Sequence, residues 1–201
     1  MDVADRLIEV ARSLFMRYGI RSVTMEDITR EMGVSKKTLY QVVDNKEDLV
    51  HQVLAHKLEE DVIALKQIQA EAIDAIDEML RVTRYILATL RDLSPAVVFD
   101  LNKYYGSIWK KVEGVHKQQT YLLIRDNLKR GISQGLYREN INPDIIARLY
   151  VAKSSLIVDE GLFPSAEYHP ATLFEETILY HMHGVASSRG LILLEKHLYE
   201  K

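Results

Sequence analysis

The sequence contains no cysteine, which excludes disulfide bridges and thiolate metal sites. It has no run of about 18 apolar residues, the length that a membrane-spanning helix needs, and Met1 and Asp2 are not followed by the cationic and apolar segments of a secretory leader. An excess of basic charge is also missing, because the formal net charge is -3. We therefore expect a soluble cytoplasmic protein that needs no membrane, and composition alone does not indicate a nucleic-acid partner.

The apolar residues are abundant and recur with the period of an α-helix. The apolar fraction is 47% in 201 residues, enough for a substantial core, and neither period-2 alternation nor an internal repeat competes with a helical pattern. We predict an all-α fold. The expected helices span residues 3–18, 25–32, 36–43, 46–69, 72–91, 95–106, 107–134, 143–160 and 172–187, with a shorter one after Arg189.

Residues 24–46 carry the most informative pattern in the chain. Thr24 is followed three positions later by Asp27, the spacing of a capping box at the start of a short helix. Gly33 ends that helix because glycine adopts the left-handed conformation, and Ser35 then caps the next one. The sequence predicts two short helices joined by a tight turn.

The second of these helices has an outward face suited to hydrogen bonding. Lys36 lies four residues before Tyr40, and Lys37 lies four residues before Gln41, so each pair shares one side of a helix. The segment holds two lysines and no acid. This arrangement is typical of a DNA-reading helix-turn-helix.

The sequence here resembles the N-terminal DNA-binding domain of the TetR family of bacterial transcriptional regulators, over about residues 5–50. The resemblance rests on Gly33-Val34-Ser35, Thr38-Leu39-Tyr40 and Lys46-Glu47-Asp48-Leu49, and upstream on Ala11, Leu14, Phe15, Gly19, Thr24 and Ile28. Three residues depart from the family pattern: Val42 stands where histidine is frequent, Val43 where phenylalanine is common, and Thr29 where alanine is usual.

The resemblance implies a set of DNA contacts. Lys36, Lys37 and Thr38 are expected at base edges, since lysine donates to guanine O6 and N7 and a threonine methyl packs on thymine. Tyr40 and Lys46 are expected at phosphates, where Lys46 begins a helix whose free amides also attract anions. The full predicted set is Thr24, Ser35, Lys36, Lys37, Thr38, Tyr40, Gln41 and Lys46. The alternatives are a plain helix cap for Thr24, a solvated pair for the two lysines and a half-buried packing role for Tyr40.

The family also implies a dimer that reads a palindromic DNA operator, with a DNA-binding domain at residues 1–46 and a helical ligand-binding and dimerisation domain at residues 47–201. Apolar residues at helical spacing near the C-terminal end predict the dimer contacts. These are Leu149, Leu156, Phe174, Ile178, His181 and Val185. Their alternative is an intramolecular core.

Aromatic residues with polar tips gather in the middle of the chain and are candidates for a pocket that binds an apolar or aromatic inducer. They are Tyr85, Phe99, Tyr105, Trp109, His116 and Tyr121. Their alternative is ordinary core packing.

Two other classes of protein compete with a ligand-released repressor. An enzyme is disfavoured, because dinucleotide, phosphate-loop, serine-elbow and zinc-protease motifs are absent, and His181 and His183 point about 200° apart on a helix. We expect neither cofactor nor metal. A helical protein-interaction module without an inducer stays open, and it predicts that loss of Lys36 and Lys37 leaves function intact.

Overall fold

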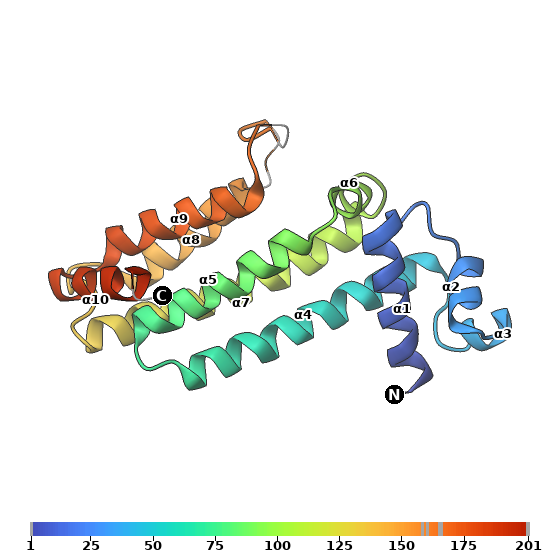
Figure 1. The fold of residues 1–201 in the computed structure, drawn as a ribbon, viewed down its shortest axis with the longest axis horizontal. Coiled ribbons are helices and arrows are strands. Elements are labelled where there is room, and N and C mark those ends of the chain that lie inside the picture. Colours follow the sequence, from blue (N-terminus) through green and yellow to red (C-terminus); the bar gives the residue numbers. More distant parts are fainter. Residues whose placement is uncertain (1, 158, 160, 165–166, 200–201) are drawn as a thin grey trace. The chain divides into compact units, whose positions relative to one another are not determined.

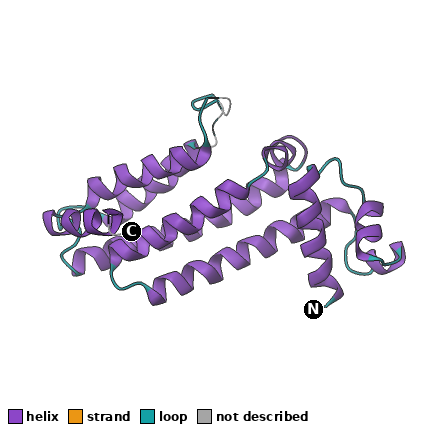
Figure 2. Ribbon diagram, in the orientation of Figure 1, coloured by secondary structure: helices purple, strands orange, loops and turns teal. Residues whose placement is uncertain are grey.

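The computed structural model describes residues 2–157, 159, 161–164 and 167–199, and every regular element in that part of the chain is a helix (Figures 1 and 2). The helices are α1 (Val3–Tyr18), α2 (Met25–Met32), α3 (Lys36–Leu39), α4 (Lys46–Glu71), α5 (Ala75–Asp92), α6 (Pro95–Tyr104), α7 (Gly106–Ser133), α8 (Pro143–Leu156), α9 (Pro170–Val185) and α10 (Ser188–Tyr199). The predicted all-α class is confirmed. Within the described residues, none of these helices combines the length and apolarity required to cross a membrane.

The chain forms two compact units, and each is continuous in space but not in sequence. The first comprises Met1–Ile63 and Leu93–His116, and the second comprises Ala64–Asp92 and Lys117–Lys201. Helices α4 and α7 each contribute to both units. These units describe packing, whereas the division at residues 46 and 47 is a functional one and stays a prediction.

The first unit holds the helix-turn-helix on a core drawn from six helices, among them α7, which contributes Ile108. Its fully buried side chains include Leu7 on α1, Ile28 on α2, Leu39 on α3 and Leu49 on α4. Leu101 adds a contact from α6. At about 2 kcal/mol for each buried aliphatic side chain, this core fixes three short elements that would not be stable as isolated helices.

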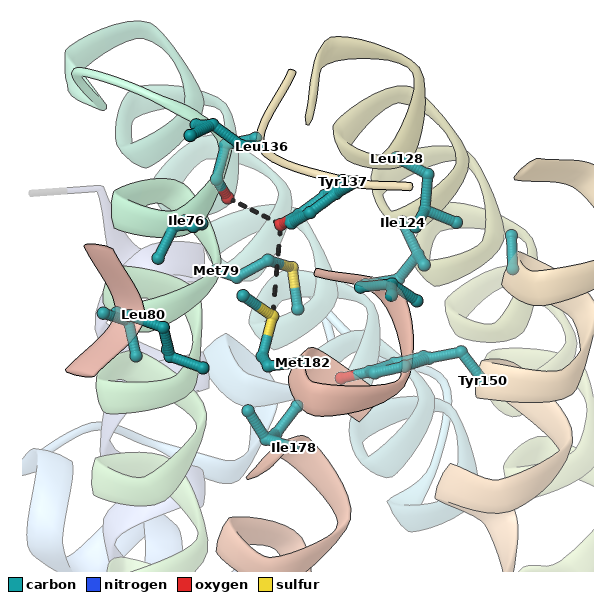
Figure 3. Packing of buried hydrophobic residues seen from close by; sticks show 14 of the residues in the cluster. Ile76, Met79, Leu80, Ile124, Leu128, Leu136, Tyr137, Tyr150, Ile178 and Met182 are labelled. Carbon is teal, nitrogen blue, oxygen red and sulfur yellow. Dashed lines mark hydrogen bonds between the residues drawn. The ribbon is translucent and has the colours of Figure 1, made fainter. Parts of the chain in front are cut away.

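The second unit is centred on Tyr137, a tyrosine with a fully buried ring (Figure 3). Its hydroxyl donates to Asn127 Oδ1 at 2.9 Å, and Asn127 Nδ2 donates to the Ala75 carbonyl at 2.9 Å. The ring fits because residue 131 is glycine: a Cβ atom there would lie 2.1 Å from a ring carbon of Tyr137. The polar tip is thus satisfied inside an apolar core, as burial of a hydroxyl requires.

Helix boundaries differ from the predictions where a local cap competes with periodicity. Helix α5 begins at Ala75 and not at 72, because the Asp74 carboxylate accepts from the amides of Ile76 and Asp77 at 2.8 and 2.9 Å. Helix α9 begins at Pro170 and not at 172, because proline suits a first helical position and the ring of His169 accepts from an amide of the first turn.

Two further boundaries concern α3 and α8. Helix α3 ends at Leu39, earlier than predicted. The next three residues form a turn, and the side chain of Val43 after it is still buried. Helix α8 ends at Leu156, and the predicted end at residue 160 lies outside the described residues.

Candidate nucleic-acid interface

The start of α2 is fixed by a reciprocal capping box. Asp27 N–H donates to Thr24 Oγ1 at 3.1 Å, while the Thr24 amide and hydroxyl donate to the Asp27 carboxylate at 2.9 and 2.6 Å. The hydrogen bond from the Thr24 side chain is the main reason why the pKa of Asp27 lies below its usual value. The capping role of Thr24 is therefore seen directly, and its phosphate contact stays a prediction.

The turn between α2 and α3 follows the predicted chemistry. Gly33 has φ +66°, a left-handed conformation that few other residues adopt, and its amide returns to the carbonyls of α2. Ser35 Oγ accepts from the Thr38 amide at 3.1 Å and lies 2.9 Å from the Thr38 hydroxyl. The hydroxyls of these two predicted DNA-contact residues thus also fix the start of α3.

The residues that depart from the family pattern are accommodated in this unit. Thr29 is buried, and its hydroxyl donates to the Glu26 carbonyl at 2.9 Å, so the extra oxygen is satisfied. Val43 is buried in the same core as Leu39, and Val42 packs against that core. None of the three changes removes a support of the turn.

Six of the predicted contact residues are exposed, and we call the four that lie on α3 and the turn after it the reading surface: Lys36, Lys37, Tyr40 and Gln41. Tyr40 is 49% exposed, so its hydroxyl contact with DNA and its half-buried packing alternative both stay open. Lys36 is not a solitary cation, because its Nζ lies 3.2 Å from Glu26 Oε2. The surface offers ammonium, hydroxyl and amide groups, which are the donors that base edges and phosphates accept.

Lys46 is more constrained than the sequence indicated. Its Nζ donates to the carbonyls of Arg21 and Val23, which close the turn between α1 and α2. Partial burial lowers its pKa from the usual value, against the opposing effects of Asp100 and Asp27. Asn45 caps the helix that follows, since its side chain accepts from the Asp48 amide at 2.9 Å. The phosphate contact of Lys46 stays a prediction, but this ammonium also has a structural task.

The same turn is held from α6 by residues that sequence reasoning missed. The Asp100 carboxylate accepts from the Arg21 amide at 2.8 Å. The Arg21 guanidinium donates to the Tyr104 hydroxyl and lies 4.5 Å from the centre of its ring. Asp100 is buried, so its partner is essential. No spacing rule links residues 79 positions apart, and the sequence carries no signal for this contact.

The six residues proposed for an inducer pocket fall in both units. In the first, Tyr105 and Trp109 pack against the apolar core, whereas Phe99 and His116 are exposed. The structure places Phe99 beside Tyr104, an edge-to-face neighbour at 6.5 Å.

The other two pocket candidates belong to the second unit. Tyr85 on α5 is half-buried. Tyr121 packs against the core and donates its hydroxyl to Asp144, with Arg148 at 4.9 Å from its ring centre. The polar tip of Tyr121 is thus already occupied. A pocket built from all six residues stays a prediction.

The predicted dimer residues separate into two groups. Four of them are buried within the second unit of a single chain, which is the intramolecular alternative: Phe174, Ile178, His181 and Val185. They face the core of their own chain because α9 packs on α5 and α8. The other two, Leu149 and Leu156, are 51% and 42% exposed on α8. The burial of these four residues within one chain fits the intramolecular alternative, and the dimer contacts stay a prediction.

The comparisons with known proteins agree with this geometry. Residues 7–53 match the model for bacterial regulatory proteins of the tetR family. The uncharacterized HTH-type transcriptional regulator YvaF of Bacillus subtilis is 24% identical over 69% of this chain and 72% of its own. The HTH-type transcriptional repressor KstR2 of Mycolicibacterium smegmatis is 20% identical over 92% of both chains. A transcriptional regulator from Cytophaga hutchinsonii shares the fold with a TM-score of 0.72 at 18% identity, over 90% of this chain and 97% of that one.

The capped helix-turn-helix, with its exposed donors on an all-helical chain, defines a DNA-binding transcriptional regulator. Its relatives are regulators and not enzymes. Residues 7–53 match the TetR family of bacterial regulatory proteins, and relatives and fold neighbours along the rest of the chain are regulators of the same kind.

Proposed function

We propose that this regulator is a repressor that binds a palindromic operator as a dimer and is released by a small apolar or aromatic inducer. The observation that carries the proposal is the reading surface, in which exposed donors stand on a turn fixed by two helix caps. In this proposal residues 1–46 bind DNA, residues 47–201 sense the inducer and dimerise, and the protein works in the cytoplasm with the chromosome.

The DNA contacts follow from the chemistry of each exposed side chain. Lys36 and Lys37 donate to guanine O6 and N7, and the methyl of Thr38 meets a thymine methyl. Tyr40 and Gln41 donate to the phosphate backbone, which fixes the register of the helix on the duplex. The unit carries little net charge, with eight basic and nine acidic residues among positions 1–50, so the location of the lysines decides the attraction.

The dimer surface of this proposal is the exposed side of α8 and α9. Ile145, Leu149 and Leu156 are 54%, 51% and 42% exposed and recur at helical spacing on α8. Tyr180 on α9 is 72% exposed, and Lys153 lies 4.6 Å from the centre of its ring, which ties the two helices together. An apolar stripe of this kind on a soluble helix pair favours burial against a second copy.

The inducer class is supported by residue chemistry and by the descriptions of two fold relatives. One is a ketosteroid regulator and the other a fatty acid degradation regulator, at TM-scores of 0.57 and 0.65. In a dimer the operator fits one separation of the two DNA-binding domains. A ligand that binds better to the dimer at another separation lowers operator affinity, by the difference between its binding free energies for the two forms.

Selection of bound sequences from a random double-stranded DNA pool tests the proposal. We expect the most enriched sequence to be palindromic, with its two half-sites about one helical turn apart or further. Its affinity for the protein should fall steeply with salt concentration. The double variant Lys36→Ala with Lys37→Ala should lose that preference. Lys46→Ala should weaken binding to all sequences alike and reduce the salt slope by about 1.

The helical interaction module gives the opposite result. It predicts no enrichment at any salt concentration, and no effect of the lysine substitutions. In that case a protein partner would replace the operator as the target of the reading surface.

A further inference from the structure

A carboxylate lies beside the reading surface, and the predicted DNA contacts did not include it. Glu26 is the second residue of α2, and its side chain is 63% exposed. Its Oε2 atom lies 3.2 Å from the Nζ atom of Lys36, whose side chain is 60% exposed. Helix α2 therefore brings a negative charge to a lysine that is expected to read bases.

The fold gains little from this ion pair. Exposed pairs contribute about 0–1 kcal/mol, because solvent screens them and two long side chains lose conformational freedom. An acid in the first turn of a helix also interacts with the helix dipole, but that effect does not require Lys36. A carboxylate near DNA phosphates also opposes binding through like-charge repulsion. The stability of the fold therefore does not account for the placement of Glu26 beside Lys36.

Lysine by itself is a poor discriminator between phosphates and bases. Its ammonium sits on a flexible four-carbon stem and has three N–H donors, so it can reach a phosphate as easily as a base edge. Only the base contact depends on sequence. A carboxylate that takes one donor leaves two, which is the number that guanine O6 and N7 accept.

We propose that Glu26 is a specificity-determining positioning residue, whose carboxylate holds the Lys36 ammonium over a base edge and keeps it from non-specific phosphate contacts. The inference rests on the proposed operator binding and adds a residue that sets its selectivity. Glu26 acts through Lys36 and does not itself read a base.

The test compares Glu26→Gln with the wild type on the selected operator and on random-sequence DNA at several salt concentrations. The substitution keeps the size of the side chain and removes its charge. We expect affinity for random DNA to rise, the salt slope to steepen by about 1, and the ratio of operator to random affinity to fall about tenfold. The base preference should relax at one position of each half-site.

Two variants make the comparison specific. Glu31→Gln removes an exposed acid from the same helix and controls for the change in net charge. In a Lys36→Ala background, Glu26→Gln should leave base preference unchanged, because the lysine that it positions is gone. Circular dichroism verifies that each variant is folded.

The outcomes separate this inference from the proposed function. If the wild type selects no sequence, operator binding itself fails. If the wild type selects an operator but Glu26→Gln behaves like Glu31→Gln, the positioning role is refuted. If Glu26→Gln still alters base preference without Lys36, the carboxylate reads a base directly and the positioning role is also refuted.

Discussion

His181 makes the stability of the second unit dependent on pH in a way that can be calculated. The imidazole is 5% exposed and packs edge-to-face against Tyr150, with ring centres 5.0 Å apart. Burial, assisted by the charge of Lys153, lowers the pKa of His181 from 6.5 to about 4. The folded chain therefore resists protonation, whereas the unfolded chain accepts a proton as soon as the pH falls below about 6.5.

The sign and size of this pH dependence follow from the difference in protons bound by the unfolded and folded states. The unfolded state binds more protons between pH 6.5 and 4, so the free energy of unfolding decreases as the pH falls through that window. Through His181 alone, the loss between pH 7.5 and pH 5 is about 2 kcal/mol. Glu78 acts in the opposite sense, because burial raises the pKa of its carboxyl group and protonation restores stability. The total pH dependence thus hides the contribution of His181.

A comparison of the wild type with His181→Gln isolates the contribution of His181 to the pH dependence of stability. Urea unfolding is followed by circular dichroism at pH 7.5 and pH 5, because the single tryptophan, Trp109, lies in the other unit. The substitution also removes the packing of His181 on Tyr150. That loss lowers the free energy of unfolding equally at both pH values and cancels in the comparison. We expect the wild type to lose about 2 kcal/mol more than the variant on acidification. His183→Gln, on the exposed side of the same helix, is the matched control. Equal pH dependence in wild type and His181→Gln would refute the reasoning.

Three further predictions concern packing, assembly and capping. Gly131→Ala should lower the free energy of unfolding in urea by about 3 kcal/mol or more, because its Cβ would overlap the Tyr137 ring. Gly114→Ala, on the same helix, is the control: its Cβ meets nothing within 4 Å, so the variant should be more stable by about 0.5–1 kcal/mol. Leu149→Glu should shift the chain toward monomer in analytical ultracentrifugation without lowering its helix content, and a variant that stays dimeric would place the interface elsewhere. Thr24→Ala should cost about 1 kcal/mol in thermal unfolding through loss of the capping box, and an unchanged midpoint would contradict the capping role.

The sequence predicted those parts of the molecule that depend on local chemistry. The capping box at Thr24, the left-handed Gly33 and the cap at Ser35 involve residues within three or four positions of one another, so spacing reveals them. The predicted start of α9 at 172 was wrong because a proline two residues earlier, preceded by a histidine cap, competed for the same role. Local rules rank such caps poorly when two are adjacent.

Contacts between distant segments were beyond the reach of the sequence. An apolar stripe such as Phe174 and Ile178 looks the same whether it faces the own core or a second copy, and only the packing of α9 on α5 decides. The hold of Asp100 on the Arg21 amide has no periodic signature at all. Lys46 was recognised as important, but its bonds to two carbonyls could not be foreseen from its position.

The separation of exposed and buried side chains within the helix-turn-helix has a consequence for evolution and for engineering. Leu39 and Val43 hold the segment in the core, whereas Lys37, Tyr40 and Gln41 project into solvent from the same short stretch of chain. Surface substitutions of this kind usually change stability by no more than about 0.5 kcal/mol. Under the proposed function, a new operator can therefore be acquired by exchanging a few exposed residues while the buried core stays unchanged. The domain is then a suitable framework for libraries that vary only those positions.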